Sequence, residues 1–535
     1  MLYNRNKTRR FPEKYNGGIG MSHELGAIVD LGSNSVRLVI YRQSSQGTQQ
    51  EIDNLKQTVR LSSHLGDDGR IDEAGIKVAL RVLEQFCQLC RAYGVTHITG
   101  IATQAVRMAV NREEVLKRIY EATGIPFRVV SGEEEARYGY LAVVNSLAME
   151  EGVTVDIGGG STEITVFRGR RLVRADSIPY GAVSLTREFL RSDLPSMKDM
   201  KNLDRVIQRE LDRRPWLTGL GFPVIGMGGT ARSLARIHQR RRHYPLLILH
   251  GYEMWPTEVT AILDMVRSMP IAKRRNINGL SADRADIITA GLAMLDQILK
   301  RVGTSRFIIS NKGLRDGVLM EQVLHIRGQE LLPDTLMYSI ENVHDQFGLN
   351  RDHAFHVWEL ADQLLTAMVK HGLVVASEEH RRWLQVAALL HDIGRAISIY
   401  NTSKHTFYLL LQIPLFGVSH RDRVMAAAIA AFKSTKQIQT YLSMYQEFFD
   451  EEDIPAIAQL GVILRLVRAF DRTETGAVTG LDLQPDGRVW KLIVKARQPL
   501  GIELDLALEW TKKCRKVFQR EIRLEVDDLD RAARI

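Results

Sequence analysis

The strongest constraint in this sequence is a pair of similar stretches in which an acidic residue ends an apolar run. "AIVDLGSNSVRLVIY" covers residues 27–41, and "GVTVDIGGGSTEITVF" covers residues 152–167. In each, Asp30 or Asp156 ends a strand-like run, a short Gly/Ser turn follows, and a second strand-like run begins. Two copies of one strand–turn–strand unit predict an α/β fold that contains an internal duplication.

The turns between these strands have the composition of an anion site. Backbone N–H groups of a Gly/Ser turn can converge on a phosphate without obstruction by side chains. The candidate phosphate contacts in the two turns are Ser33, Asn34, Ser35, Gly158, Gly159, Gly160 and Ser161, and the stretch "GMGGTAR" adds Gly228, Gly229 and Thr230. Asp30 and Asp156 would hold a divalent cation or a water molecule, because a bare carboxylate repels phosphate. Asp-x-Gly after a strand is also ordinary hairpin chemistry, and Arg37 could face either side of its strand.

The pattern along the chain changes several times, which indicates several domains. Strand-like runs alternate with a helical pattern over residues 73–93, and "LSADRADIITAGLAMLDQILK" predicts a helix capped by Ser281. From about residue 328 helical periodicity is nearly continuous, and strand-like runs return after residue 479. The expected division is a flexible basic tail over 1–23, α/β domains over 24–138 and 139–328, a helical domain over 335–479 and a small α/β appendage over 480–535.

Composition limits the function classes. The net charge of +9 favours an anionic partner, but aromatic residues are not interleaved with the basic cluster "ARIHQRRRHY", so no nucleic acid is expected. No apolar run reaches the roughly 20 residues of a membrane span, and the first residues lack the apolar core of a secretory signal, so a cytoplasmic protein is expected. Of three cysteines, Cys87 and Cys90 fall within a helical pattern and are expected in its core rather than on zinc.

The motifs together resemble a known family. "DLGSNSVRL", "DIGGGSTEI" and "GMGGTAR" are similar to the phosphate loops of the actin, sugar-kinase and heat-shock ATPase superfamily. With "SGEEEARYGYLAV", "YGAVSLTREF", "LSADRADIITAGLAML" and "GLRDGVL", residues 26–317 resemble the exopolyphosphatase / guanosine pentaphosphate phosphatase family. The resemblance implies two duplicated actin-like, ribonuclease H-like domains, a cleft between them that hydrolyses phosphoanhydrides, magnesium as cofactor, and a homodimer.

The acidic stretch "SGEEEAR" shows what the resemblance adds to the residues. Ser131 followed by Glu134 is a capping box, so three glutamates at a helix start need no catalytic role. The family's catalytic glutamate precedes Ala-Arg, which selects Glu135. The same resemblance implies that Arg107 binds phosphate, that Ser161 donates a hydrogen bond to it, and that Glu163 contacts the metal or a water molecule. Without the resemblance, Arg107 would be interpreted as a surface ion-pair residue.

The helical part carries a second candidate site. "DHAFHVWELA", "LLHDIGR" and "LRLVRAFDRT" place His353, His391, Asp392 and Asp471 in the H…HD…D order that resembles the HD superfamily, whose ligands hold one or two divalent metals. The alternative is a hydrogen-bonded remnant that extends the cleft. His405 is a possible additional ligand, and His356, His371 and His420 are expected in the core or on the surface.

The expected function is an exopolyphosphatase that releases orthophosphate from inorganic polyphosphate, with Mg²⁺ as cofactor and Glu135 as general base. The first alternative is hydrolysis of guanosine pentaphosphate at the same site. The second is a sensor that binds polyphosphate or nucleotide without turnover, and a third is a separate phosphohydrolase activity in the HD-like domain.

Overall fold

The first domain is built on a five-stranded sheet. The computed structural model describes residues 23–487 and 489–528, so the expected basic tail lies outside the described residues except for His23. The elements are β1 (His23–Leu31), β2 (Ser35–Ser44), β3 (Gln49–Thr58), η1 (Leu61–Ser63), α1 (Glu73–Tyr93), β4 (His97–Ala102), α2 (Gln104–Met108), α3 (Arg112–Thr123), β5 (Phe127–Val129) and α4 (Gly132–Val144). The strand order is β3-β2-β1-β4-β5. The predicted helix over 73–93 is α1, and its buried Cys87 and Cys90 confirm the core assignment.

The second domain repeats this arrangement. Its elements are β6 (Glu151–Ile157), β7 (Thr162–Arg168), β8 (Arg171–Ile178), α5 (Ala182–Phe189), α6 (Met197–Asp212), η2 (Pro215–Leu217), β9 (Val224–Met227), α7 (Gly228–Arg241), β10 (Tyr252–Met254), α8 (Pro256–Arg267), α9 (Ile271–Arg274), η3 (Ala282–Arg284), α10 (Ile288–Val302), β11 (Phe307–Ile309) and α11 (Leu314–Arg327). The order β8-β7-β6-β9-β11 matches β3-β2-β1-β4-β5, with β10 added at the edge. In both sheets the first three strands are antiparallel and the next two are parallel. The predicted duplicated actin-like fold is confirmed.

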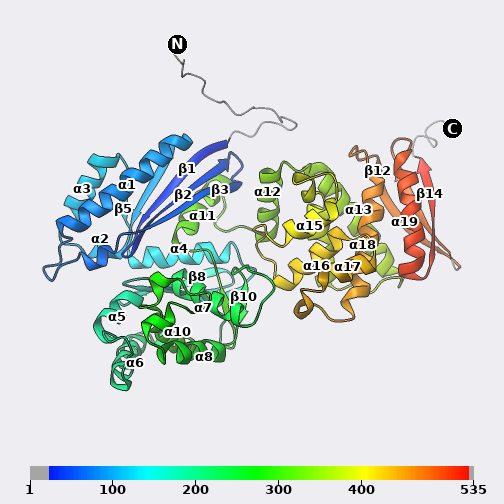
Figure 1. Ribbon diagram of the computed structural model, residues 1–535. Helices are drawn as coiled ribbons and strands as arrows, with labels where there is room; N and C mark the ends of the chain where they lie inside the picture. Colours follow the sequence, from blue (N-terminus) through cyan, green and yellow to red (C-terminus); the bar gives the residue numbers. More distant parts are fainter. Residues whose placement is uncertain (1–22, 488, 529–535) are drawn as a thin grey trace, which may run out of the picture.

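Helices α4 and α11 connect the two domains (Figure 1). Helix α4 follows the first sheet in sequence but packs on β6, β7 and β8 of the second, and α11 follows the second sheet but contacts β1 of the first. The two helices also pack on each other, and a shared apolar core joins them to residues of both sheets. The expected division between residues 138 and 139 falls inside α4.

One predicted helix begins later than the sequence pattern suggests. Ser281 does not cap the helix over 281–300; it precedes the 3₁₀ turn η3 and makes no side-chain capping hydrogen bond, and α10 begins only at Ile288. The prediction of Ser281 as the cap therefore placed the helix start one element too early. The irregular segment has a consequence for the site, because Arg284, at the end of η3, lies against Gly229 and Thr230.

The C-terminal part is helical and ends in a small sheet. Its elements are α12 (Thr335–Phe347), α13 (Arg351–Lys370), α14 (Glu378–Leu390), η4 (Ile393–Ala396), α15 (Thr402–Leu410), α16 (His420–Ala431), α17 (Thr435–Leu442), η5 (Gln446–Phe448), α18 (Asp453–Phe470), β12 (Val478–Asp486), β13 (Val489–Ala496), α19 (Ile502–Phe518) and β14 (Glu521–Asp528). One continuous core joins the helices to β12, β13 and α19. The expected helical and α/β segments are both present.

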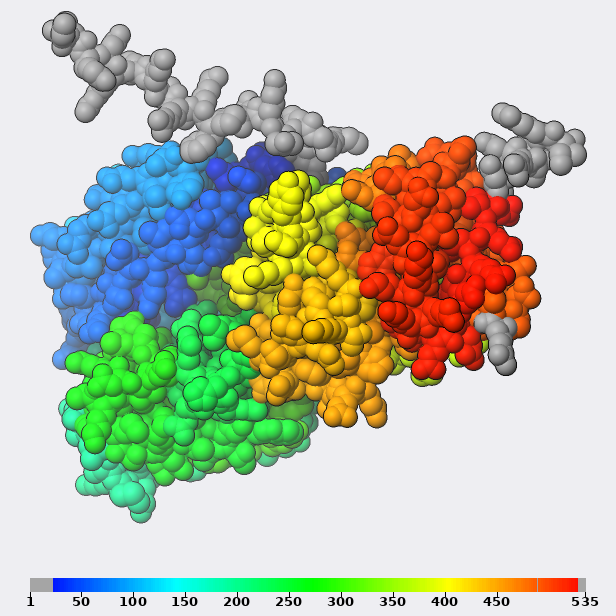
Figure 2. All heavy atoms as spheres, turned by 45° about the vertical axis from the view of Figure 1, so that its right-hand side comes forward, coloured from blue at the N-terminus to red at the C-terminus, as the bar shows by residue number. Residues whose placement is uncertain are grey.

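The helical part rests against the two N-terminal domains (Figure 2). The Tyr244 hydroxyl lies 2.7 Å from His420 Nδ1, and the Gly417 N–H donates to the Ser146 carbonyl at 3.1 Å. Burial lowers the pKa of His420 to about 4, so this histidine is neutral in the interface. Among the described helices, none combines the length and the apolar character that crossing a membrane requires.

The crossing of α4 and α11 yields a testable consequence. A methyl group on Gly317 of α11 would lie 2.0 Å from the Tyr138 carbonyl oxygen of α4, so Gly317→Ala must push the helices apart. We expect a loss of about 1–3 kcal/mol in the free energy of unfolding, measured by denaturant titration. The matched control is Gly501→Ala, whose methyl would meet no atom within 4 Å. Equal stability of the two variants would contradict this account of the crossing.

Candidate active site

The two duplicated hairpins close with the same backbone hydrogen bond. The Gly32 N–H donates to the Ser35 carbonyl at 3.1 Å, and the Gly158 N–H donates to the Ser161 carbonyl at 2.9 Å. The strand register pairs Asp30 with Arg37 in the first hairpin and Asp156 with Glu163 in the second. Equivalent positions therefore carry a cation in one copy and a carboxylate in the other.

Neighbouring backbone holds both turns in place. The Asn34 carbonyl accepts the N–H groups of Val59 and Arg60, and the Gly159 carbonyl accepts those of Val183 and Ser184. Hydrogen bonds to the carbonyl groups of both turns thus fix the turn backbone beside the cleft.

The start of α7 lies against Asp156. Gly228 has φ +70°, and a Cβ there would lie 2.1 Å from Asp156 Oδ1. A glycine at this position meets both requirements, the positive φ and the close approach of backbone to carboxylate. The N-terminal N–H groups of α7 therefore reach the floor of the cleft.

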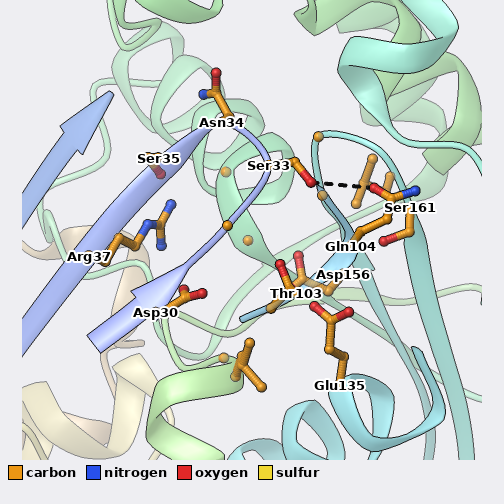
Figure 3. A pocket seen from close by; sticks show the side chains of 18 of the residues that line it. Asp30, Ser33, Asn34, Ser35, Arg37, Thr103, Gln104, Glu135, Asp156 and Ser161 are labelled. Carbon is orange, nitrogen blue, oxygen red and sulfur yellow. Dashed lines mark hydrogen bonds between the residues drawn. The ribbon is translucent and has the colours of Figure 1, made fainter. Parts of the chain in front are cut away.

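Most of the predicted phosphate contacts line one cleft between the domains (Figure 3). The residues that were predicted from the sequence and that line this cleft are Asp30, Ser33, Asn34, Ser35, Arg37, Glu135, Asp156, Gly158, Gly159, Gly160, Ser161, Glu163, Gly228 and Gly229. The register and the picture place Arg37 on the cleft side of β2, which the sequence left open. Thr230 is fully buried beneath this surface, where its hydroxyl accepts from Arg284 at 3.4 Å.

Glu135 points into the cleft from the first turn of α4. Its neighbours confirm the predicted capping box, since the Ser131 hydroxyl accepts from the Glu134 N–H and the Glu134 carboxylate accepts from the Ser131 N–H. Glu135 Oε2 accepts from Arg107 Nη1 at 2.6 Å, and the same nitrogen donates to the Val130 carbonyl at 2.6 Å. Arg107, predicted as a phosphate ligand, is not among the residues that line the cleft, and it contacts Glu135 directly.

The carboxylates of the cleft hold protons more tightly than isolated carboxylates. Burial and the charge of Glu163 raise the pKa of Glu135 well above its ordinary value, although Arg107 opposes this. Burial raises the pKa of Glu163 to about 7, against hydrogen bonds from the Ser161 and Ser177 hydroxyls. Burial likewise raises the pKa of Asp30 and of Asp156, against nearby arginines.

Several cations face these carboxylates, and sequence analysis missed most of them. The additional lining cations are Lys56, Arg232, Arg284, Lys312 and Arg315. Burial, followed by repulsion from Arg37, lowers the pKa of Arg232 to about 10 and also lowers the pKa of Arg284 and Arg315. Arg232 and Arg315 stand within motifs already noticed, "GMGGTAR" and "GLRDGVL", so the signal was present but was assigned to the glycines.

The donors at Asp30, Asp156 and Glu163 are carboxylate oxygens, which Mg²⁺ prefers. The three do not form a compact cage: among the described residues the one group of three possible ligands with all ligand atoms within 4.8 Å is His353, His391 and Asp392. A magnesium ion in the cleft would therefore need water and substrate phosphate to complete its coordination shell, as is usual for Mg²⁺ in proteins.

The four HD-type residues, His353, His391, Asp392 and Asp471, lie close together in the helical part, but only three of them form a compact group of possible metal ligands. His353 Nε2 lies 3.2 Å from His391 Nε2, and His353 Nδ1 lies 2.6 Å from Asp471 Oδ2. Asp471 thus holds His353 from behind and stands outside the three-residue group, as does His405. Burial and Arg468 lower the pKa of His391 to about 3, so its imidazole is neutral.

The comparison with known families agrees with this architecture. Residues 39–326 match the Ppx/GppA phosphatase family, and residues 337–528 match domain III of the Ppx/GppA phosphatases. The chain belongs to the Ppx/GppA phosphatase family. The match begins within β2, so the first turn precedes the matched range.

Solved structures of this family are similar in fold. A Ppx/GppA family member from Aquifex aeolicus is 30% identical, with TM-score 0.51, and the match covers 57% of this chain and 99% of the other. An exopolyphosphatase from Cytophaga hutchinsonii is 23% identical, with TM-score 0.53, and the match covers 57% and 99%. Because its sequence identity is only 23%, the similarity to the Cytophaga hutchinsonii structure supports the fold and nothing further.

Proposed function

We propose that this Ppx/GppA phosphatase is an exopolyphosphatase that hydrolyses the terminal phosphoanhydride bond of inorganic polyphosphate. The observation that carries the proposal is the convergence of four guanidinium groups, Arg37, Arg232, Arg284 and Arg315, on the cleft. Within the described residues, none of the four forms an ion pair with a carboxylate. Repelling cations held this close favour a ligand that carries several negative charges.

The lining of the cleft favours a chain of phosphates over a nucleotide. The described lining residues contain no aromatic side chain on which a purine could stack. The cations come from both domains, with Arg37 on β2 of the first and Arg315 on α11 of the second. A linear polyanion between the domains would contact both groups.

In the proposed reaction Glu135 is the general base. It takes a proton from a water molecule as the water oxygen bonds to the terminal phosphorus, and the bond from that phosphorus to the bridging oxygen breaks. The products are orthophosphate and a chain shorter by one phosphate. Arg107 orients the carboxylate, and the guanidinium groups stabilise the charge that develops on the leaving oxygen.

Magnesium is part of the proposal, with Asp30, Asp156 and Glu163 as its protein contacts. Phosphatases of this family generally depend on a divalent metal. A bound Mg²⁺ would neutralise phosphate charge beside the carboxylates.

The family resemblance also supports a homodimer, and the three free, buried cysteines support a reducing, cytoplasmic location.

One experiment separates the candidate functions. Phosphate release is measured from purified protein offered polyphosphate and guanosine pentaphosphate side by side, with magnesium present and then chelated. Faster release from polyphosphate supports the proposal, and faster release from guanosine pentaphosphate supports the first alternative. Saturable binding of either compound without release of phosphate would support a sensor. The position of Glu135 in the cleft argues against a sensor, because binding alone does not need a base.

The base assignment can be tested with neighbouring glutamates. Glu135→Gln keeps the size of the side chain but removes the proton acceptor, so we expect turnover of polyphosphate to fall by about 10²–10⁴-fold with little change in affinity. Glu134→Gln is the matched control, because glutamine also serves in a capping box and the side chain pairs with Arg128 rather than facing the cleft. Near-normal turnover by Glu135→Gln would show that another group is the base.

The raised pKa values predict the acidic limb of the pH profile. A general base acts when deprotonated, so turnover should rise as the pH passes the apparent pKa of the coupled Glu135–Glu163 pair, well above 4.5. Glu163→Gln removes a negative charge near Glu135 and should move this limb to lower pH, whatever its effect on the maximal rate. An unchanged limb in a kcat/KM profile would contradict the electrostatic account.

The metal role of Asp156 predicts a different defect. Asp156→Asn removes a charged ligand, so we expect a weaker apparent affinity for magnesium, with turnover partly restored at high magnesium. The comparison is Glu135→Gln, whose defect extra magnesium should leave in place. Magnesium titrations of polyphosphate hydrolysis measure both, and identical responses would refute the division of roles.

A further inference from the structure

A second polar pocket lies in the helical part, apart from the cleft. It opens between α18, α19 and the segment around η4, and its wall includes His353, Asp392 and Trp510. Its lining cations are Arg395, Lys433, Arg465, Arg468 and Arg472, and its lining carboxylates are Asp392, Asp471 and Glu474. The stretch "LRLVRAFDRT", noted for Asp471, supplies three of these arginines.

The carboxylates of this pocket already have partners. Asp392 pairs with Arg468 at 2.6 Å and with Arg395 at 2.8 Å. Glu474 pairs with Arg395 at 3.1 Å. Asp471 accepts from His353 and from the Gly476 N–H, and His356 Nδ1 lies 3.0 Å from its Oδ2. No lining carboxylate remains free to balance a further positive charge.

This pairing fits a metal ion poorly. The spacing of His353, His391 and Asp392 is close enough for a cation. However, two guanidinium groups contact the carboxylate that would have to bind it, and like charges at this distance repel strongly. The fourth HD-type residue, Asp471, holds His353 and lies outside the group. The signature residues are present, but their surroundings oppose a divalent metal.

Three lining cations have no carboxylate partner among the described residues: Lys433, Arg465 and Arg472. Arg465 donates instead to the Phe432 carbonyl at 2.6 Å and to the Ser403 hydroxyl at 2.8 Å, which are neutral acceptors. Its guanidinium also lies 5.9 Å from the Trp510 ring centre. Arg465 is therefore held rigidly at the pocket wall with its charge uncompensated.

We infer that this pocket binds a small inorganic polyphosphate anion such as pyrophosphate, and that the HD-type residues form its floor rather than a metal centre. Lys433, Arg465 and Arg472 contact the anion, since planar guanidinium groups match phosphate oxygens and the lysine adds a point charge. Trp510 closes the apolar side of the pocket. This inference does not depend on the activity proposed for the cleft.

Trp510 provides a reporter that the cleft lacks, because no tryptophan lines the cleft among its described residues. We expect inorganic pyrophosphate, added to the full chain with chelator present, to change tryptophan emission in a saturable way. Trp510→Phe should abolish this change. Lys433→Ala with Arg472→Ala should weaken the apparent affinity by roughly 3–10-fold, the scale expected for two exposed cations. Orthophosphate, with less charge, should bind more weakly.

The matched control is Lys404→Ala with Lys436→Ala, which removes two exposed lysines that do not line the pocket. If the two double variants weakened pyrophosphate binding equally, the effect would come from overall charge, and the inference would be overturned. The lack of any Trp510-dependent change would also overturn it. A third arm adds Mn²⁺ without pyrophosphate: stoichiometric retention of manganese that is lost in His391→Ala would show a metal centre instead. Circular dichroism checks that each variant is folded.

Discussion

The backbone hydrogen bond that closes each hairpin turn is the constraint on which the site depends. The Gly32 and Gly158 N–H groups fix two tight turns, and each turn leaves an aspartate at the end of the preceding strand. Because the turns are copies, Arg37 and Glu163 occupy the same register position in the two domains. Duplication of one backbone geometry thus places a guanidinium in one hairpin and a carboxylate at the matching position of the other, and both line the cleft.

The buried carboxylates and the buried cations of the cleft are each unfavourable without a ligand. Burial raises the pKa of Glu163 and of its neighbour Glu135, while burial and Arg37 lower the pKa of Arg232. A polyphosphate chain with its counter-cation would relieve both strains, because it brings negative charge to the arginines and positive charge to the carboxylates. Preorganised charge of this kind is costly to the empty protein and useful in a reaction that moves charge onto a leaving oxygen.

Local sequence patterns predicted the repeated unit and much of the site. Helical periodicity placed α1 at its observed ends, and the Asp-Gly/Ser turns identified both loops that line the cleft. Strand β3 escaped detection because its polar side chains are mostly exposed and its pairing with β2 defines it. Arg284 stands in the quoted stretch "LSADRADIITAGLAML" but was not identified as a cleft residue, since it reaches the cleft from η3, where a helix was expected. These features depend on tertiary contacts that periodicity does not record.

The helical part shows that a signature gives the residue types and not their charge environment. The H…HD…D order correctly predicted that His353, His391 and Asp392 meet. It could not predict that Arg468, in the last turn of α18, would pair with Asp392, or that Arg465 and Arg472 would line the same pocket. Arg465 and Arg468 are three residues apart on α18 and Arg472 follows just after its end, so their charges repel one another unless anions balance them. The same reasoning that assigns the cleft to a polyanion therefore applies to the second pocket, where the protein supplies only part of the balancing charge.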